Sequence, residues 1–285
     1  PFIDPTASIT GTLTRITIKE QSYIGPFAAV TASGNVDIGH ATNLQDNVSV
    51  FGTGAVTLGD EVILAHGAQV RAPATIGRTA VVGEHNAAFV GFNSLVQGAK
   101  VEHDAMVLHL SRVAPGVTVK HGKVVLSGKN VTTQAQADDV ALGKVIPISD
   151  GLRAFMEGVL HVNKAFAREY TNLYRDNPSN VRGINYDPGN SDFNAVRDLP
   201  TLSGVATRDP SYRNRIIGDV TMANTRAELE QDDDDHPIGN FISLRADEGE
   251  PFHVGLIEKM GDRTTFHALE HTGLDIHDHV SYGVR

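Results

Sequence analysis

Four histidines lie close together near the end of the sequence, in the segment TTFHALEHTGLDIHDHVSYGVR that covers residues 264–285. Imidazole is the commonest metal ligand among protein side chains. His277 and His279 alternate, so on a strand both side chains would point to one side and could hold a metal, although a solvated turn is the commoner setting for such a pair. A metal site here needs further ligands, and other elements of the chain must supply them.

The composition excludes several kinds of site and partner. The chain has 285 residues, enough for one large or two medium domains, and it has no cysteine, which excludes thiolate zinc ligands and disulfides. Its formal net charge of −10 argues against a nucleic-acid partner, because phosphate binding needs a basic surface. No apolar run approaches the ~20 residues of a membrane span. We therefore expect no membrane insertion and a soluble protein, with a slight preference for the cytoplasm. The chain begins at Pro1 without a methionine, and whether it is a fragment stays open.

An aliphatic residue recurs at every sixth position through the first half of the chain. No α-helix has this period, whereas three short strands that close a triangular coil do, each strand pointing one aliphatic side chain to the axis. Glycine often follows the aliphatic residue, as in IGPF, IGHA and LGDE, where a turn tolerates it best. The period predicts a mainly β fold, a left-handed parallel β-helix with a continuous core, over residues 2 to about 128. The residues predicted to point inward are Ile18, Ile24, Val30, Ile38, Leu44, Val50, Leu58, Leu64, Val70, Ile76 and Val82, and after one inserted residue Phe89, Leu95, Val101, Val107, Val113, Val119 and Val125.

A helical pattern replaces the six-residue period after Val125. The stretch DGLRAFMEGVLHVNKAFAREYTNLY predicts a long helix near residues 150–175, with Asp150 as its N-cap and its apolar side packed antiparallel along the coil. Residues 176–204 are rich in Asn, Asp, Pro and Gly and predict a linker. The apolar residues at helical spacing are Leu152, Phe155, Val159, Phe166, Tyr170 and Leu173.

A second and shorter run of the same kind follows the linker. DPSYRNRIIGDVTM resembles DPTASITGTL near the N-terminus, and aliphatic residues again recur at six-residue steps. We therefore interpret the chain as a partial tandem duplication, with a first domain at 1–175 and an incomplete second domain at 205–285. The acidic stretch EQDDDDH at 230–236 is expected to be a solvated loop, with a calcium site as the less favoured alternative. The inward residues of the second copy are Ile238, Leu244, Val254, Met260, Phe266, Ile276 and Tyr282.

Several segments resemble the active-site segments of γ-class carbonic anhydrases. The second copy carries LRADEGEPFHVG and GDRTTFHALE, and the first carries LQDNVSVF, VILAHGAQVRAP, VTTQAQAD and EGVLHVN. The resemblance covers most of the chain outside the linker. The hexapeptide period alone is a weak signal, because acyltransferases share it. The resemblance implies a trimeric β-helix enzyme with a C-terminal helix, whose zinc ion is held by three histidines at an interface between subunits.

Two of the three implied zinc ligands are present, one in each copy. By this resemblance His267 is the first ligand, and the first copy has Phe51 there. The ligand donated by a neighbouring subunit is His66, where the second copy has Val284. Because these losses are complementary, any metal site is predicted to combine His267 of one copy with His66 of the other.

The third implied ligand is not found at its expected position in the given sequence. Its position holds Arg71 in the first copy and falls beyond Arg285 in the second. A zinc site needs at least three protein ligands, so the third is expected from His271, from residues after the given sequence, or from another chain. Iron or cobalt is the alternative to zinc.

The resemblance also implies five further site residues. Arg245 and Asp247 match the wall of the active site, and Asp262 matches its second aspartate. Gln45 matches the residue that orients bound water, and Glu270 matches the acidic residue that carries the proton outward. A purely structural salt bridge between Arg245 and Asp262 is the alternative interpretation.

The implied activity is the reversible hydration of carbon dioxide to bicarbonate, a lyase reaction. Bound zinc lowers the pKa of water to about 7, and the resulting hydroxide attacks carbon dioxide. The expected assembly is a homotrimer or a pseudo-trimer of copies. Two alternatives stay open: a metal-free scaffold of the same fold that assembles with partners, and a hexapeptide acyltransferase, which is less favoured because no acceptor pocket is recognisable.

Overall fold

The computed structural model describes residues 1–12, 15–176, 213–218, 220–225, 228, 237–269 and 272–283. The chain divides into two compact units, Pro1–Arg168 and Glu169–Arg285, and the division falls inside the helix α2 (Asp150–Asp176). Each unit is described by itself. The acidic stretch and all but the first residue of the predicted linker lie outside the described residues. The predicted domain boundaries at 175 and 205 stay predictions.

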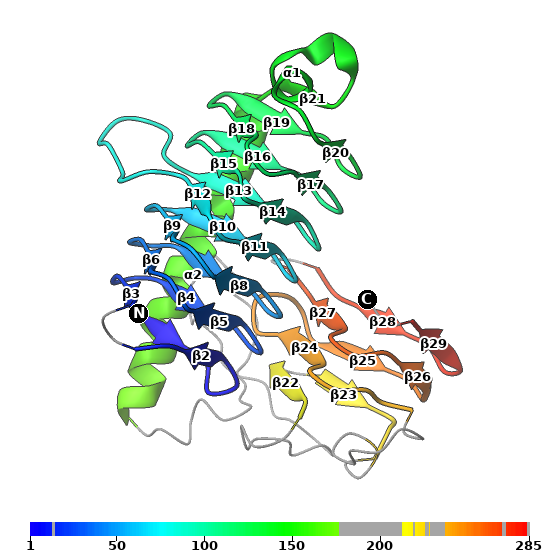
Figure 1. The fold of residues 1–285 in the computed structure, drawn as a ribbon. Helices are drawn as coiled ribbons and strands as arrows, with labels where there is room; N and C mark the ends of the chain where they lie inside the picture. Colours follow the sequence, from blue (N-terminus) through cyan, green and yellow to red (C-terminus); the bar gives the residue numbers. More distant parts are fainter. Residues whose placement is uncertain are drawn as a thin grey trace. The chain divides into compact units, whose positions relative to one another are not determined.

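The first unit is a left-handed β-helix of short, mostly parallel strands, as the six-residue period predicts (Figure 1). Each coil contributes one strand to each of three sheets. The first sheet contains β1 (Phe2–Ile3), β4 (Tyr23–Ile24), β7 (Asn43–Leu44), β10 (Val62–Leu64), β13 (Ala88–Val90), β16 (Ala105–Val107), β19 (Lys123–Val125) and β21 (Val145–Pro147). The second contains β2 (Ser8–Thr10), β5 (Ala29–Ala32), β8 (Ser49–Gly52), β11 (Gln69–Arg71), β14 (Leu95–Gln97), β17 (Arg112–Val113) and β20 (Asn130–Val131). The third contains β3 (Ile16–Ile18), β6 (Val36–Ile38), β9 (Val56–Leu58), β12 (Ala74–Ile76), β15 (Lys100–Val101) and β18 (Thr118–Val119).

The end of this coil is closed by a different kind of structure. Strand β21 pairs with β19 in the antiparallel direction, whereas the other strand pairs of the unit are parallel. The helices α1 (Gln134–Asp138) and η1 (Val140–Leu142) precede β21. The TTQAQADD segment therefore enters a short helix, in agreement with the sequence, and the antiparallel strand ends the parallel stacking.

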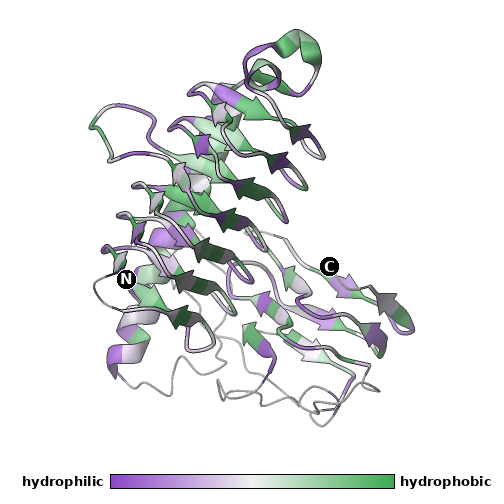
Figure 2. Ribbon diagram, in the orientation of Figure 1, coloured by the Kyte–Doolittle hydropathy of each residue, from purple (hydrophilic) through white to green (hydrophobic). Residues whose placement is uncertain are grey.

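The core of the coil is a set of aliphatic ladders. Val30, Val50 and Val70 are paired in register on successive strands and have no exposed surface. Hydrophobic residues recur in this way on the strands of successive coils (Figure 2). Full burial of such a side chain stabilises the fold by roughly 1.5–3 kcal/mol, so the stacked ladders are the main source of stability.

The predicted register is wrong around residue 82. Val82 is fully exposed, because residues 77–87 form a loop between β12 and β13 instead of a further strand. The following strands begin one residue later than predicted, so Val90 and Val96 lie in the core in place of Phe89 and Leu95. Register is restored at Val101, which is buried as predicted.

Phe89, which was predicted to point to the axis of the coil, packs against helix α2 instead. Phe89 faces outward from the first sheet and packs in a buried cluster with Met156 and Leu160 of helix α2. Phe166, further along the helix, lies 5.6 Å from the ring of Tyr23 in an early coil. The helix therefore runs back along the coil, and the predicted antiparallel packing is confirmed.

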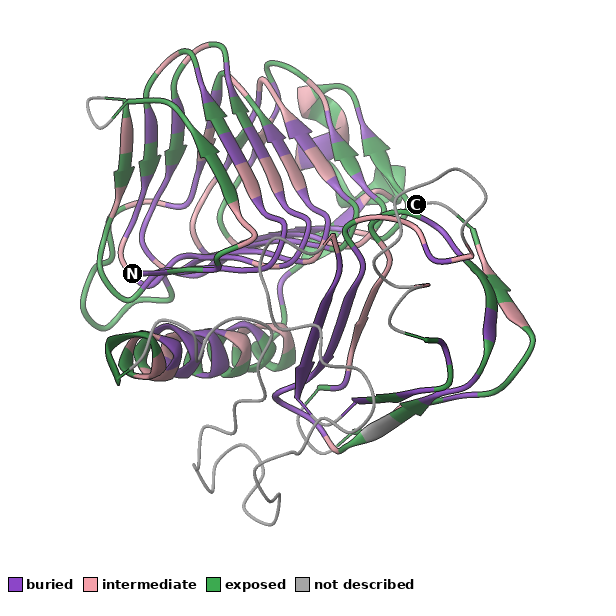
Figure 3. Cartoon of the chain, turned by 90° about the horizontal axis from the view of Figure 1, so that it is seen from below, coloured by how far each residue is buried: buried purple, intermediate pink, exposed green. Residues whose placement is uncertain are grey.

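The start and the apolar side of helix α2 differ in detail from the prediction. Asp150 is the first residue of the helix, and the capping contact comes from Ser149, whose Oγ accepts a hydrogen bond from the backbone N–H of Leu152 at 3.3 Å. Phe155 is 44% exposed, and Met156 is buried next to it. Buried and exposed residues alternate along the helix, as an amphipathic helix requires (Figure 3).

Glycine at the coil corners is required by close approach of successive coils. A Cβ atom on Gly39 would lie 2.2 Å from the carbonyl oxygen of Gly59 in the next coil. No side chain fits at that distance, so the IGHA and LGDE corners stack only because these positions are glycine.

The second unit contains a shorter set of parallel coils (Figure 1). Ile238, Leu244 and Val254 are completely buried there, and Phe266 and Tyr282 pack against the same cluster, as predicted. The fold is therefore partially duplicated. Its strands are β22 (Arg215–Gly218), β23 (Val220–Met222), β24 (Ser243–Ala246), β25 (Phe252–Val254), β26 (Ile257–Met260), β27 (Thr265–His267), β28 (Asp275–Ile276) and β29 (Val280–Tyr282). Among the described residues, no helix has the length and apolar character needed to cross a membrane.

Replacement of one axial residue tests the ladder. Leu64 is completely buried, so Leu64→Ala is expected to lower the free energy of unfolding by about 2–5 kcal/mol. Leu110 is 69% exposed, and Leu110→Ala should change it by less than about 0.5 kcal/mol. Guanidinium unfolding followed by circular dichroism measures both, and equal effects would contradict the axial core.

Candidate functional site

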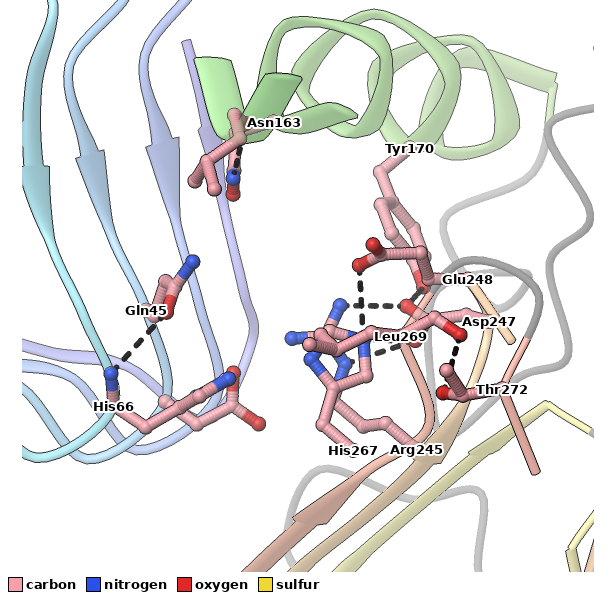
Figure 4. Close-up of polar contacts among 12 residues, drawn as sticks. Gln45, His66, Asn163, Tyr170, Arg245, Asp247, Glu248, His267, Leu269 and Thr272 are labelled. Carbon is pink, nitrogen blue, oxygen red and sulfur yellow. Dashed lines mark hydrogen bonds and ion pairs between the residues drawn. The ribbon is translucent and has the colours of Figure 1, made fainter. Parts of the chain in front are cut away.

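Parallel stacking in the second unit brings three of the predicted site residues together. Arg245 on β24 is paired in register with His267 on β27. Asp247 follows two residues after Arg245, just past the end of β24. Because residues two apart on a strand point to the same side, the three side chains gather on one face of the coil (Figure 4).

Asp247 is the centre of this cluster. Its carboxylate is completely buried, and Arg245 donates to both of its oxygens, from Nε to Oδ1 at 3.0 Å and from Nη2 to Oδ2 at 2.7 Å. Tyr170, which lies on the part of helix α2 that belongs to the second unit, donates its hydroxyl to Oδ2 at 2.5 Å. Burial by itself raises the pKa of Asp247, but the positive charge of Arg245 and the neighbouring His267 outweigh it and hold that pKa well below its usual range.

His267 faces two carboxylates. Its Nε2 lies 3.5 Å from Oδ1 of Asp247 and 3.4 Å from Oε2 of Glu248. The His267 side chain is only 6% exposed. Two acidic groups beside an imidazole in a site with little water make the surroundings of His267 attractive to a cation.

Two residues of this cluster were not among the sequence candidates. Glu248 follows Asp247 directly in the RADEG segment, so its place in that segment was the available signal. Tyr170 was expected only as an apolar residue of the helix, and its hydrogen bond to Asp247 arises from tertiary packing.

The first unit holds the other predicted imidazole. His66 follows β10 at a coil corner, and its backbone N–H donates to Oε1 of Gln45 at 3.2 Å (Figure 4). Its Nδ1 lies 3.6 Å from Oδ1 of the fully buried Asp46, and its ring stacks on Phe92 with 5.6 Å between centroids. The carboxylate favours a proton on Nδ1, which leaves Nε2 as the nitrogen suited to bind a metal.

A buried amide lies on the strand that precedes Gln45. Asn43 is 1% exposed, and neither atom of its amide has a hydrogen-bond partner among the described residues. Buried polar groups are nearly always paired, with protein or with bound water. This residue, also missed by sequence reasoning, therefore marks a polar part of the first unit that suits a water molecule or a small polar ligand.

Asp262 lies at a coil corner of the second unit, and its role in the implied site stays a prediction. Its carboxylate oxygen Oδ1 accepts the backbone N–H of Asn240 at 2.8 Å, and the residue is exposed. Asp278 makes the same contact with the N–H of Leu256 at 2.7 Å. Asp262 therefore caps a coil corner, and the described ion pair of Arg245 is with Asp247.

The remaining candidates are divided between exposed and undescribed positions. Glu270, His271 and Val284 lie outside the described residues. His277 is 86% exposed, and His279 is 73% exposed and pairs with Glu258 at 3.1 Å. The HDH segment is therefore a solvated turn. Arg71, at the position of the third implied ligand, is exposed and donates to Gln69 at 3.3 Å.

The described residues of each unit supply no complete zinc site. No group of three or more His, Asp or Glu side chains in the described part of the chain is arranged to hold a metal ion. His66 and His267 each have the chemistry of a ligand: an imidazole of low exposure with a carboxylate near one ring nitrogen. Because zinc takes at least three protein ligands, neither imidazole with its described neighbours is a complete zinc site.

Known proteins share sequence with this chain at a modest level. No family model matches it. It is 28% identical over 194 residues to a carbonic anhydrase of Methanosarcina thermophila, a match that covers 59% of this chain and 72% of that protein. It is also 28% identical over 183 residues to the carboxysome assembly protein CcmM of a Nostoc species, covering 59% of this chain and 30% of that protein.

Two solved structures show a lower similarity to this chain. A hexapeptide transferase family protein from Anaplasma phagocytophilum has 22% identity and a TM-score of 0.45, covering 59% of this chain and 91% of that one. A putative acetyltransferase from Bacillus cereus has 17% identity and a TM-score of 0.38, covering 59% of this chain and 99% of that one. The sequence similarities and the coil together confirm the resemblance to γ-class carbonic anhydrases and hexapeptide-repeat proteins.

Removal of the central carboxylate tests the buried ion pair. Asp247→Asn leaves the guanidinium of Arg245, which is 1% exposed, without its opposite charge. We expect the second unit to lose about 3–5 kcal/mol of stability at neutral pH. Asp275, whose side chain is 68% exposed, gives the control variant Asp275→Asn, with an expected change below about 0.5 kcal/mol. Urea unfolding measures both, and a small effect of Asp247→Asn would contradict the pairing.

The loss of stability in Asp247→Asn is expected to depend on pH. The folded pKa of Asp247 lies below its ordinary value of 3.8, so its ionised form stabilises the protein fully above that pH and loses this contribution as the pH falls towards the folded pKa. The stability difference between the unmodified protein and Asp247→Asn should be constant between about pH 7 and about pH 5 and should shrink below about pH 4. A difference that grows on acidification would contradict the sign of the shift.

Proposed function

We propose that this chain is a zinc-dependent enzyme of the carbonic anhydrase type, which hydrates carbon dioxide reversibly to bicarbonate. The observation that carries the proposal is the buried cluster of Arg245, Asp247 and His267, at the positions that the resemblance assigns to the active site. The similarity to the Methanosarcina carbonic anhydrase supports it independently of the cluster.

The proposed site is shared between copies. His267 of one copy and His66 of the other supply the imidazoles, because each copy lacks the ligand that the other retains. Such sharing requires assembly through the faces of the coils, into a homotrimer or a pseudo-trimer of copies. Zinc, or iron or cobalt in its place, would supply Lewis-acid chemistry that makes water nucleophilic near neutral pH.

The chain's own residues have separable roles in this proposal. The carboxylate of Asp46 lies 3.6 Å from Nδ1 of His66, a neighbour of the kind that raises the metal affinity of the other ring nitrogen. Gln45 is oriented by accepting the backbone N–H of His66, so its amide nitrogen is available to a substrate or water. Asp247, fixed by Arg245, keeps a negative charge beside His267. Glu270 is proposed, from the resemblance, to carry the released proton outward.

A metal-free scaffold is the second candidate function. Phe51 and Arg71 occupy two positions that the resemblance assigns to ligands, and neither side chain binds zinc. The carboxysome assembly protein among the similar sequences supports an assembly role. Zinc analysis of the purified protein separates the two candidates, because the scaffold binds none.

Separate removal of the two imidazoles tests the shared site. We expect His267→Ala and His66→Ala each to abolish stoichiometric zinc binding and carbon dioxide hydration, because two ligands do not hold zinc tightly. His277→Ala, at a side chain that is 86% exposed, should change neither. Zinc is measured by atomic absorption and hydration by stopped-flow pH change. Full zinc and full activity in His66→Ala would show that the site is not shared.

A further inference from the structure

Tyr170 carries a buried hydroxyl on the apolar side of helix α2. The residue is 2% exposed, and its hydroxyl donates to Oδ2 of Asp247 at 2.5 Å (Figure 4). This length is typical of a hydroxyl that donates to an ionised carboxylate. Phe166, one turn earlier on the same side of the helix, is 1% exposed and has no hydroxyl, so burial on this side does not require one. The hydroxyl of Tyr170 is therefore explained by Asp247 and not by packing.

Arg245 and Tyr170 hold the Asp247 carboxylate in different ways. The guanidinium of Arg245 donates to both oxygens, at 3.0 Å and 2.7 Å, and a fork of this kind fixes the plane of the carboxylate relative to the arginine. Because Arg245 and Asp247 are two residues apart, this contact is local. Tyr170 lies 77 positions earlier in the sequence, on the part of helix α2 that belongs to the second unit. Its hydroxyl therefore fixes the carboxylate relative to a separate element of that unit.

The other oxygen of the same carboxylate faces the imidazole of His267. Oδ1 of Asp247 lies 3.5 Å from Nε2, and the two side chains are 0% and 6% exposed. Strand pairing places His267 beside Arg245, but it fixes the backbone and leaves the side-chain torsions to be set by other contacts. A carboxylate held at three points restricts the orientation of the ring, because electrostatic interactions are strong where there is little water.

We propose that Tyr170 is a positioning residue of the candidate site, and that it acts through Asp247 to orient the imidazole of His267. Its hydroxyl holds the carboxylate at the place where Oδ1 faces Nε2. This role involves residues of the second unit alone. Its consequence for the hydration of carbon dioxide rests on the proposed function.

The direct test is NMR of the imidazole nitrogens, in protein made with isotope-labelled histidine, freed of metal with a chelator and held at a fixed pH. The signals of His267 are those that disappear in His267→Ala. Tyr170→Phe keeps the ring and its packing and removes the hydroxyl, so we expect it to displace these signals. The signals of His277, which is 86% exposed, should not move.

The matched control is Tyr174→Phe, one turn later on the same helix. This residue is 52% exposed, so loss of its hydroxyl should leave the His267 signals unmoved. A ring-fluorinated tyrosine at position 170 gives an independent measurement that does not depend on how well Tyr170→Phe folds. It keeps the hydroxyl and the packing but changes the strength of the hydrogen bond to Asp247, so it should displace the His267 signals as well.

The same variants are compared in carbon dioxide hydration. We expect Tyr170→Phe to lower kcat about 10-fold with little change in KM, at the lower end of the loss of about 10–100-fold that is typical when an outer contact of a metal ligand is removed. Tyr174→Phe should hydrate carbon dioxide at the unmodified rate. Circular dichroism verifies that each variant is folded.

The outcomes distinguish this inference from the proposed function. Unmoved His267 signals in folded Tyr170→Phe, or in the fluorinated protein, overturn the positioning role, whether or not hydration falls. Equal displacement in Tyr174→Phe also overturns it, because the effect would then belong to the end of the helix in general. Displaced signals in a protein that hydrates no carbon dioxide support the positioning role and overturn the proposed activity.

Discussion

The stacking of parallel coils in strict register is the constraint on which the rest of this protein depends. Backbone hydrogen bonds between successive coils place equivalent residues directly beside each other. Inward, this produces aliphatic ladders such as Val30, Val50 and Val70. Outward, the same register places His267 beside Arg245, although the two residues are separated by 22 positions in sequence. The inward-facing side chains of the repeated strands form the hydrophobic core, and the outward-facing side chains form the candidate site.

The buried charges of the second unit are tolerated because they are paired. A guanidinium or carboxylate taken out of water alone costs several kcal/mol. Arg245, Asp247 and Tyr170 satisfy one another through hydrogen bonds of 2.5–3.0 Å. The group is therefore rigid, and rigidity is what a site needs to hold an imidazole in one orientation. Burial by itself raises the pKa of the Asp247 carboxylate, but Arg245 and His267 outweigh it and hold that pKa below its usual range.

The two copies carry different parts of the site that the resemblance implies. The first copy carries a complete coil and one imidazole with its supporting carboxylate, and the second carries the arginine–aspartate pair with the other imidazole.

The sequence by itself determined the architecture and the chemical centre. A six-residue period has only one regular solution, the triangular coil, so the β-helix, its duplication and most inward residues were predictable. Arg245, Asp247 and His267 were recognisable because their segments are short and continuous. Their convergence was confirmed by the structure, while their roles stay predictions.

The tertiary structure decided what local patterns do not encode. The loop at 77–87 leaves Val82 in solvent, since a period cannot reveal where the chain leaves the coil. Asp262 caps a corner, and Tyr170 hydrogen-bonds to Asp247 from a helix more than 70 residues earlier. Glu248 approaches His267 only because Gly249 allows two backbone segments to meet. Each of these contacts joins residues distant in sequence, so its geometry exists only after the coils have stacked.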